Sequence, residues 1–240
     1  MSAGVALVVG AGPGLGSAVA RRFAREGLHV VVTRRRGELE ELVAAIEAAG
    51  GRATARHSDA RDEEAVKALV EAIETDLGPL EAVVYNVGAN VMFPVLQTTA
   101  QVYRKVWEMG ALGGFLDGRE VAARMVPRGR GSILFTGATA SLRGAAGFSA
   151  FAGAKHALRA LAQSMARELG PAGVHVAHVV VDGPIDNANT RRLFADAFAK
   201  RPEDGILKPE DLADLFWMLH AQPRSAWTFE LDARPYVERW

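Results

Sequence analysis

The 240-residue chain contains no cysteine and carries no excess of either charge. The absence of cysteine excludes disulfide bonds, thiolate nucleophiles and thiolate metal ligands, and it fits a reducing compartment, so we expect a cytoplasmic protein. Because 28 basic residues balance 28 acidic ones, no overall field would attract nucleic acid or an anionic membrane, and we expect neither partner. No apolar run approaches the roughly 18 residues that span a bilayer, and no basic segment marks a signal peptide. No group of His, Asp and Glu has the spacing of a metal site.

Short apolar runs alternate with amphipathic helical stretches along the whole chain. The apolar runs predict strands, and the stretches between them, with apolar residues three or four positions apart, predict helices. We expect seven strands: one ending near residue 57, and six at residues 5–9, 29–33, 82–85, 133–135, 174–181 and 227–231. The helix expected over residues 100–125 is interrupted by Gly110, Gly113 and Gly114. This rhythm predicts a parallel sheet with helices on both faces, and the absence of a linker or repeat predicts one domain over residues 1–240.

A glycine-rich segment, Gly10-Ala11-Gly12-Pro13-Gly14-Leu15-Gly16, follows the first predicted strand and precedes the first predicted helix. Glycine permits a tight turn and lets the backbone approach a pyrophosphate, which then lies at the helix N-terminus. The alternative is an ordinary glycine-rich turn. The position between a strand and a helix favours a dinucleotide site with contacts from Gly10, Gly12, Gly14, Leu15 and Gly16.

The spacing of these glycines resembles that of the short-chain dehydrogenase/reductase family, and the resemblance extends over nearly the whole chain. A second segment that carries it is Ser149-Ala150-Phe151-Ala152-Gly153-Ala154-Lys155, which keeps the family's lysine four residues after the position of its tyrosine. The resemblance implies an α/β fold with a Rossmann-type, doubly wound parallel sheet. It also implies a nicotinamide cofactor, a small-molecule substrate and a homodimer or homotetramer.

The residues after the second predicted strand bear on the choice of dinucleotide. Domains that prefer NAD have an acidic residue there, which binds the ribose 2′-hydroxyl. This chain has Thr33-Arg34-Arg35-Arg36 instead, and arginines bind a 2′-phosphate through charge-assisted hydrogen bonds. A solvated basic patch is the alternative, although a basic cluster at a helix N-terminus opposes the helix dipole. We therefore expect NADP(H) rather than NAD(H), with Arg34 and Arg35 as contacts.

The family resemblance implies further cofactor contacts at the ends of later strands. The acid after the third strand matches a turn that meets the adenine, and Asn86-Val87-Gly88 matches the family's Asn-Ala-Gly. Asn, Asp and Gly also serve ordinary turns, so a structural role is the alternative at these positions. The expected contacts are Asp59, Ala60, Asn86, Gly88, Gly183 and Ile185.

Four positions carry the chemistry of this family, and this chain retains one of them. Lys155 is retained, and the family also uses it to hold the nicotinamide ribose. The tyrosine position is Phe151, and the serine position, thirteen residues earlier, is Ala138. The asparagine position aligns with Gly110. Phenylalanine and alanine have no hydroxyl, so the proton donor and the oxyanion partner of the usual carbonyl reduction are both absent.

Other side chains near these positions could supply the missing proton. Thr139 and Ser141 follow Ala138 closely, and Asp182 stands where the family has proline, at the end of the sixth strand. An aspartate there could act as a general acid if burial raised its pKa. More often such an aspartate caps a turn.

Three functions remain open from the sequence. The first is an NADP(H)-dependent oxidoreductase that reduces a small carbonyl or activated C=C substrate by a non-standard proton route. The second is a catalytically degenerate NADP(H)-binding protein that acts as a sensor or scaffold, and the third is a non-redox enzyme with a structural cofactor. Residues 227–240, rich in aromatic side chains, are expected to dock against their own domain or a second subunit.

Overall fold

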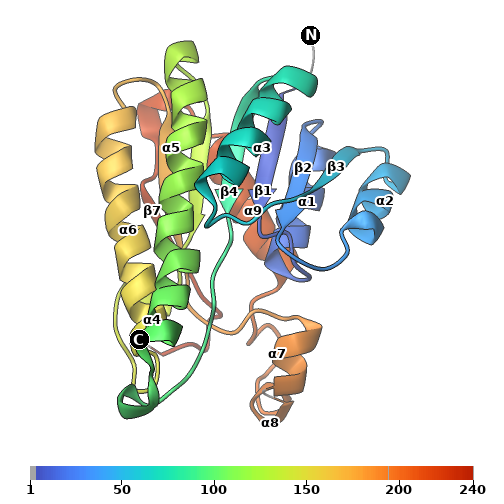
Figure 1. Cartoon of the computed structure of the whole chain (residues 1–240). Coiled ribbons are helices and arrows are strands. Elements are labelled where there is room, and N and C mark those ends of the chain that lie inside the picture. Colours follow the sequence, from blue (N-terminus) through green and yellow to red (C-terminus); the bar gives the residue numbers. More distant parts are fainter. Residues whose placement is uncertain (1–3, 194, 240) are drawn as a thin grey trace.

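The computed structural model describes residues 4–193 and 195–239 (Figure 1). Within these residues, seven parallel strands form one sheet in the order β3-β2-β1-β4-β5-β6-β7. The order runs outward in both directions from β1 and β4, which confirms the predicted Rossmann-type, doubly wound sheet. The strands are β1 Val5–Val9, β2 His29–Arg34, β3 Arg52–His57, β4 Leu80–Tyr85, β5 Ser132–Thr136, β6 His175–Val181 and β7 Glu230–Ala233.

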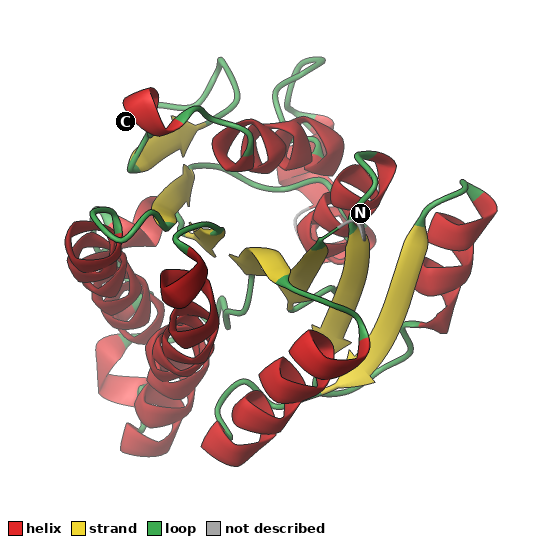
Figure 2. Ribbon diagram, turned by 90° about the horizontal axis from the view of Figure 1, so that it is seen from above, coloured by secondary structure: helices red, strands yellow, loops and turns green. Residues whose placement is uncertain are grey.

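Helices cover both faces of the sheet (Figure 2). One apolar cluster lies between the sheet and α1, α2 and α9, and a second lies between the sheet and α3, α5 and α6. The strands are therefore buried on both sides, which is why β1 is apolar at every position. No helix in the described part of the chain combines the length and the apolar character needed to cross a bilayer. The helices are α1 Leu15–Arg25, α2 Glu40–Ala48, α3 Glu63–Asp76, α4 Ala100–Trp107, α5 Gly113–Met125, α6 Ser149–Leu169, α7 Ala188–Leu193, α8 Ala195–Ala199 and α9 Pro209–His220.

The helical region over residues 100–125 leaves α-helical geometry at Gly110, as predicted, but it remains continuous, and Gly113 and Gly114 do not interrupt it. Helix α4 continues through a π-helical turn, Glu108–Leu112, directly into α5. The glycines also serve close packing. A Cβ on Gly110 would lie 2.9 Å from Ala154 Cβ, and one on Gly113 would lie 2.3 Å from the Tyr85 hydroxyl. Helix α6 and strand β4 can approach this helix because these two side chains are missing.

The seventh strand lies later in the chain than the predicted residues 227–231. Trp227 does not join the sheet, because its ring stacks on His175 with centroids 4.9 Å apart and an interplanar angle of 2°. The strand proper begins at Glu230, beside His178 of β6.

The tail after β7 packs against its own chain. Glu238 forms an ion pair with Arg201 at 2.9 Å, and Pro235 lies against Gly183 in the loop after β6. Tyr236 is 74% exposed, so its ring does not take part in this packing. Trp240, which belongs to the same aromatic tail, lies outside the described residues.

Candidate functional site

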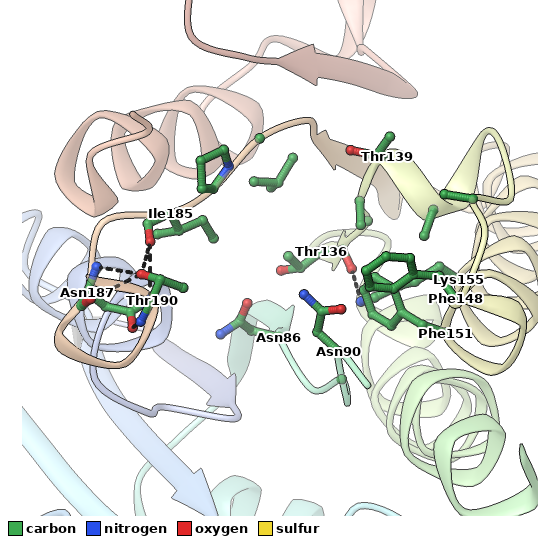
Figure 3. A pocket seen from close by; sticks show the side chains of 18 of the residues that line it. Asn86, Asn90, Thr136, Thr139, Phe148, Phe151, Lys155, Ile185, Asn187 and Thr190 are labelled. Atoms are coloured by element: carbon green, nitrogen blue, oxygen red, sulfur yellow. Dashed lines mark hydrogen bonds between the residues drawn. The ribbon is translucent and has the colours of Figure 1, made fainter. Parts of the chain in front are cut away.

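A cavity of about 630 Å³ opens at the carboxyl ends of the central strands (Figure 3). Its walls come from the segments after β4, β5 and β6 and from the first turns of α6. In open parallel sheets ligands bind at this edge, where the strand order reverses. Among the described residues, no group of three or more His, Asp or Glu side chains is placed to hold a metal ion.

The loop between β1 and α1 folds closely around its glycines. The amide of Gly10 donates to Thr33 O at 2.9 Å, which ties the loop to β2. Gly10 and Gly14 have φ angles of 90° and 108°, a region that side chains disfavour. A Cβ on Gly16 would lie 2.4 Å from Gly10 O, whereas one on Gly12 would have no neighbour within 4 Å. The loop is therefore tightly packed on its protein side and open at Gly12.

Helix α1 begins directly after this loop with its first turn uncapped. No side chain accepts a hydrogen bond from its first amides, and its first turn contains no acidic residue. The Ser17 amide donates to Gly12 O at 3.1 Å. The amides of Leu15 and Gly16, with the positive end of the helix dipole, are therefore the groups that can bind an anion. Leu15 offers only its backbone, because its side chain is buried in the core. The loop and the helix end together fit the pyrophosphate of a dinucleotide.

A basic surface lies at the carboxyl ends of β2 and β3. Asp59 accepts two hydrogen bonds from the Arg61 guanidinium, at 2.9 and 2.6 Å, and these lower the pKa of its carboxyl group. Arg35 Nη1 lies 3.9 Å from the same carboxylate, with 45% of its side chain exposed. Arg34 lies over Gly37, whose Cβ would be 2.9 Å from the Arg34 guanidinium carbon. Three guanidinium groups, of Arg34, Arg35 and Arg61, thus lie at this edge of the sheet, and such donors fit a further phosphate group.

The other expected cofactor contacts lie around the same cavity. Asn86 Nδ2 donates to Gly10 O at 3.1 Å, so this side chain joins β4 to the glycine loop. Gly88 lies close to the Lys155 ammonium, since a Cβ added at Gly88 would be 3.4 Å from Lys155 Nζ. Ala60 is buried beneath α5. The residues among these that line the cavity are Asn86, Gly88, Gly183 and Ile185.

Lys155 is buried at the cavity wall. Its side chain is 5% exposed, and Nζ donates to Thr136 O at 2.7 Å. Burial lowers the pKa of the ammonium group to about 8. Phe151 and Lys155 are four residues apart on α6, so they share one face of the helix. Nζ lies 5.9 Å from the centre of the Phe151 ring.

Phe151 and Ala138 both line the cavity, and neither has a hydroxyl group. Phe148 lies beside Phe151, so two phenyl rings form the wall next to the Lys155 ammonium (Figure 3). Gly110 does not line the cavity, because the π-helical turn packs it against α6. Among the lining residues that the structure describes, the hydroxyl groups belong to Thr136, Thr139 and Thr190.

The three side chains expected as substitute proton donors differ in their position relative to the cavity. Thr139 lines the cavity, but its hydroxyl donates to Asp182 Oδ1. Ser141 is fully buried, and its Oγ accepts a backbone amide at 3.1 Å. Asp182 is 2% exposed and lies 3.6 Å from Arg143 and 3.8 Å from Arg234. Ser141 and Asp182 therefore lie behind the cavity wall rather than on it.

Several lining residues were not recognised from the sequence. They come from loops, short helical turns, the short helices α7 and α8 and the end of β5, which bring side chains together without any long periodic spacing, so only the topology shows that they meet. Phe148 directly precedes α6, three residues before Phe151, so its nearness to the start of that helix is a signal that could have found it. The unrecognised residues with polar, charged or aromatic side chains are Asn90, Thr136, Arg143, Phe148, Asn187, Thr190, Phe198 and Arg201.

Comparisons with known proteins agree with this geometry. A model of the short chain dehydrogenase family matches residues 4–197. The 1-deoxy-11-beta-hydroxypentalenate dehydrogenase of Streptomyces exfoliatus is 32% identical over 235 residues, which cover 95% of this chain and 84% of that protein. The crystal structure of a short-chain dehydrogenase from Rhodopseudomonas palustris is 49% identical, with a TM-score of 0.84 over 98% of this chain and 100% of that one. A metagenomic short-chain oxidoreductase in complex with NADP is 26% identical, with a TM-score of 0.84 over 98% of both chains.

Proposed function

Because the chain belongs to the short chain dehydrogenase family, whose members use NAD(P)(H) and small-molecule substrates, we propose that it is an NADP(H)-dependent oxidoreductase of non-standard mechanism. It reduces a small carbonyl or activated C=C compound without the family's tyrosine and serine. One observation carries this proposal. A glycine loop that fits a pyrophosphate opens toward the same cavity as a buried Lys155, while Phe151 and Ala138 leave that cavity without the usual acid.

We assign Lys155 as the proton donor in this reduction. Bound NADPH would supply a hydride to the substrate carbon, and reduction also needs a proton on the neighbouring oxygen or carbon. Arginine does not release its proton near neutral pH, and neither does a threonine hydroxyl. The Lys155 ammonium, with a pKa of about 8, holds a proton at neutral pH and can release it. After transfer, the neutral amine regains a proton from solvent.

The preference for NADP(H) is supported by Arg34 and Arg35 and by the solved relative that holds NADP. Replacing both arginines with alanine is expected to weaken NADPH binding by about 10- to 100-fold and to leave NADH binding unchanged. Fluorescence titration of both reduced cofactors measures this. Arg25→Ala, on the exposed surface of α1, serves as the control. Equal affinity of the wild-type protein for NADH and NADPH would contradict the preference.

Turnover is tested directly by incubating the protein with NADPH and a panel of enones and ketones. We expect the absorbance of the reduced cofactor to fall with at least one compound that carries an activated C=C or C=O group. If NADPH binds but no compound causes oxidation, the oxidoreductase proposal is wrong and the binding-protein alternative takes its place.

The loss of both hydroxyls, at positions 151 and 138, is the observation that favours this alternative, a degenerate NADP(H)-binding protein. The double variant Phe151→Tyr/Ala138→Ser is expected to gain ketone reduction by about 10²-fold, because it restores a proton donor and an oxyanion partner beside Lys155. Ala140→Ser, at another lining position, adds a hydroxyl elsewhere and should gain nothing. Activity confined to the double variant would favour the degenerate protein, whereas activity already present in the wild type favours the enzyme.

We also propose that the chain forms a homodimer or homotetramer, since its family is typically oligomeric. Aromatic side chains on α4 and α5 support this. Tyr103 is 43% exposed, and Trp107 and Phe115 are each 40% exposed. Large apolar side chains grouped on one helix surface are a common feature of subunit interfaces.

A further inference from the structure

The charged side chains that line the cavity are all cationic in the part of the chain that the structure describes. They are Lys155, Arg143 and Arg201, and no carboxylate lines the wall. Most of the remaining lining is apolar and includes three phenyl rings, of Phe148, Phe151 and Phe198, with polar groups from asparagine and threonine side chains between them. A site of this composition favours a ligand with an apolar body and a negative charge, because a charge pair is strengthened where the walls exclude water.

Among the described lining residues, Arg143 is the cation whose charged group makes no hydrogen bond, whereas Lys155 and Arg201 both donate to backbone oxygens. Arg143 lies between the short helical turn Thr139–Ser141 and α6. Its only ion pair in the described residues is with Asp182, at 3.6 Å, which is too long for a hydrogen bond. That carboxylate is buried and already accepts the Thr139 hydroxyl. With its side chain 46% exposed, the planar fork of donors on Arg143 remains available to a carboxylate in the cavity.

Arg201 differs from Arg143 in this respect. Its Nη1 forms an ion pair with Glu238 at 2.9 Å and donates to Gly205 O at 3.2 Å. These contacts hold the segment after α8 to the C-terminal tail. Arg201 thus adds positive charge to the cavity, but its guanidinium is already engaged in these structural contacts.

The place of Arg143 separates it from the phosphates of a dinucleotide. Thr139, whose hydroxyl shares Asp182 with Arg143, lies across the cavity from Asn187 (Figure 3). Asn187 adjoins the glycine loop, since a Cβ on Gly14 would be 3.4 Å from Asn187 Cβ. The cofactor phosphates therefore belong to the Asn187 side, and Arg143 belongs to the side left for the substrate.

We infer that the substrate is an organic acid with an apolar body, whose carboxylate is bound by Arg143 while the body packs against Phe148 and Phe151. Calling this acid a substrate rests on the proposed function. The binding of the acid by Arg143 requires only the cavity. The acid group lies at the cavity rim, so the reacting carbon is a different one, deeper in the cavity near Lys155.

The test measures binding rather than turnover. The protein is saturated with NADP⁺, and the affinities of cyclohexanecarboxylate and cyclohexanecarboxamide are compared by calorimetry. These probes share an apolar ring and differ in charge. We expect the acid to bind about ten-fold more tightly than the amide, as a charge-assisted bidentate pair would give. In Arg143→Met this preference should disappear, with the amide affinity unchanged.

Arg130→Met is the matched control. Arg130 is similarly exposed, pairs with Glu81 at 2.8 Å, and precedes β5, so it lies at the opposite edge of the sheet from the cavity. It should keep the preference for the acid. Equal affinities for acid and amide, failure of both probes to bind, or a preference that survives in Arg143→Met would each overturn the inference. Failure of NADP⁺ to bind would instead count against the proposed function, and the two probes would still be compared without cofactor.

Discussion

Lys155→Met is expected to lower kcat by about 10²- to 10⁴-fold, the usual contribution of a positioned general acid. The methionine matches the length of the lysine and lacks both its charge and its proton. The wild-type rate of reduction should also fall as the pH rises through about 8, because the buried ammonium loses its proton there. His178, the other titratable group facing Lys155, stays neutral in this range, since burial lowers its pKa to about 4. The measurements are kcat and its pH profile with the best substrate of the panel.

Lys155→Arg separates proton transfer from cofactor binding. Arginine keeps the positive charge that we propose for holding the cofactor ribose but does not release a proton at this pH. We expect NADPH affinity within several-fold of wild type and a kcat as low as that of Lys155→Met. Thermal melting checks that both variants are folded. If either variant retained kcat within about three-fold of wild type and the same pH profile, the proton would come from water and the assignment to Lys155 would fail.

Asp117→Asn is expected to stabilise the protein increasingly as the pH rises. Asp117 lies on α5, one turn after Gly113 and near Tyr85, and is 1% exposed. Neither of its carboxyl oxygens accepts a hydrogen bond. Burial raises the pKa of this group from 3.8 to about 8. The fold thus holds a carboxyl group that is costly to ionise.

The sign of the effect follows from the direction of the pKa shift. Between roughly pH 4 and 8 the unfolded chain releases the Asp117 proton and the folded chain keeps it, so the free energy of unfolding falls with rising pH. Asparagine does not titrate. The stability difference between Asp117→Asn and wild type should therefore grow by about 3 to 4 kcal/mol from pH 5 to pH 8.

Urea denaturation of both proteins at these two pH values measures the difference. Asp76→Asn, at an exposed position at the end of α3, is the control for the substitution itself, because it relieves no burial of a carboxyl group. A constant difference between Asp117→Asn and wild type would mean that Asp117 is ionised or hydrated in the folded protein.

Much of the fold could be predicted from local patterns in the sequence. The tight turn of the glycine loop could be predicted because its backbone conformation is determined by a few neighbouring residues. The spacing of Phe151 and Lys155 could be interpreted because four residues make about one helical turn, whatever surrounds the helix. The seventh strand was misplaced because Trp227 stacks on His175, a residue about fifty positions earlier.

The sequence by itself determined the sheet, the glycine loop and the absence of hydroxyls at positions 151 and 138, since each depends on residue types at short spacing. Only the tertiary structure decided which side chains share the cavity. It placed Asp182 behind the wall and Arg143 on it, and it showed that Gly110 packs against α6. The physical reason is that burial and charge pairing depend on segments that are far apart in the chain. Tertiary packing, and not the periodic spacing of residues in the sequence, determines which of these segments come into contact.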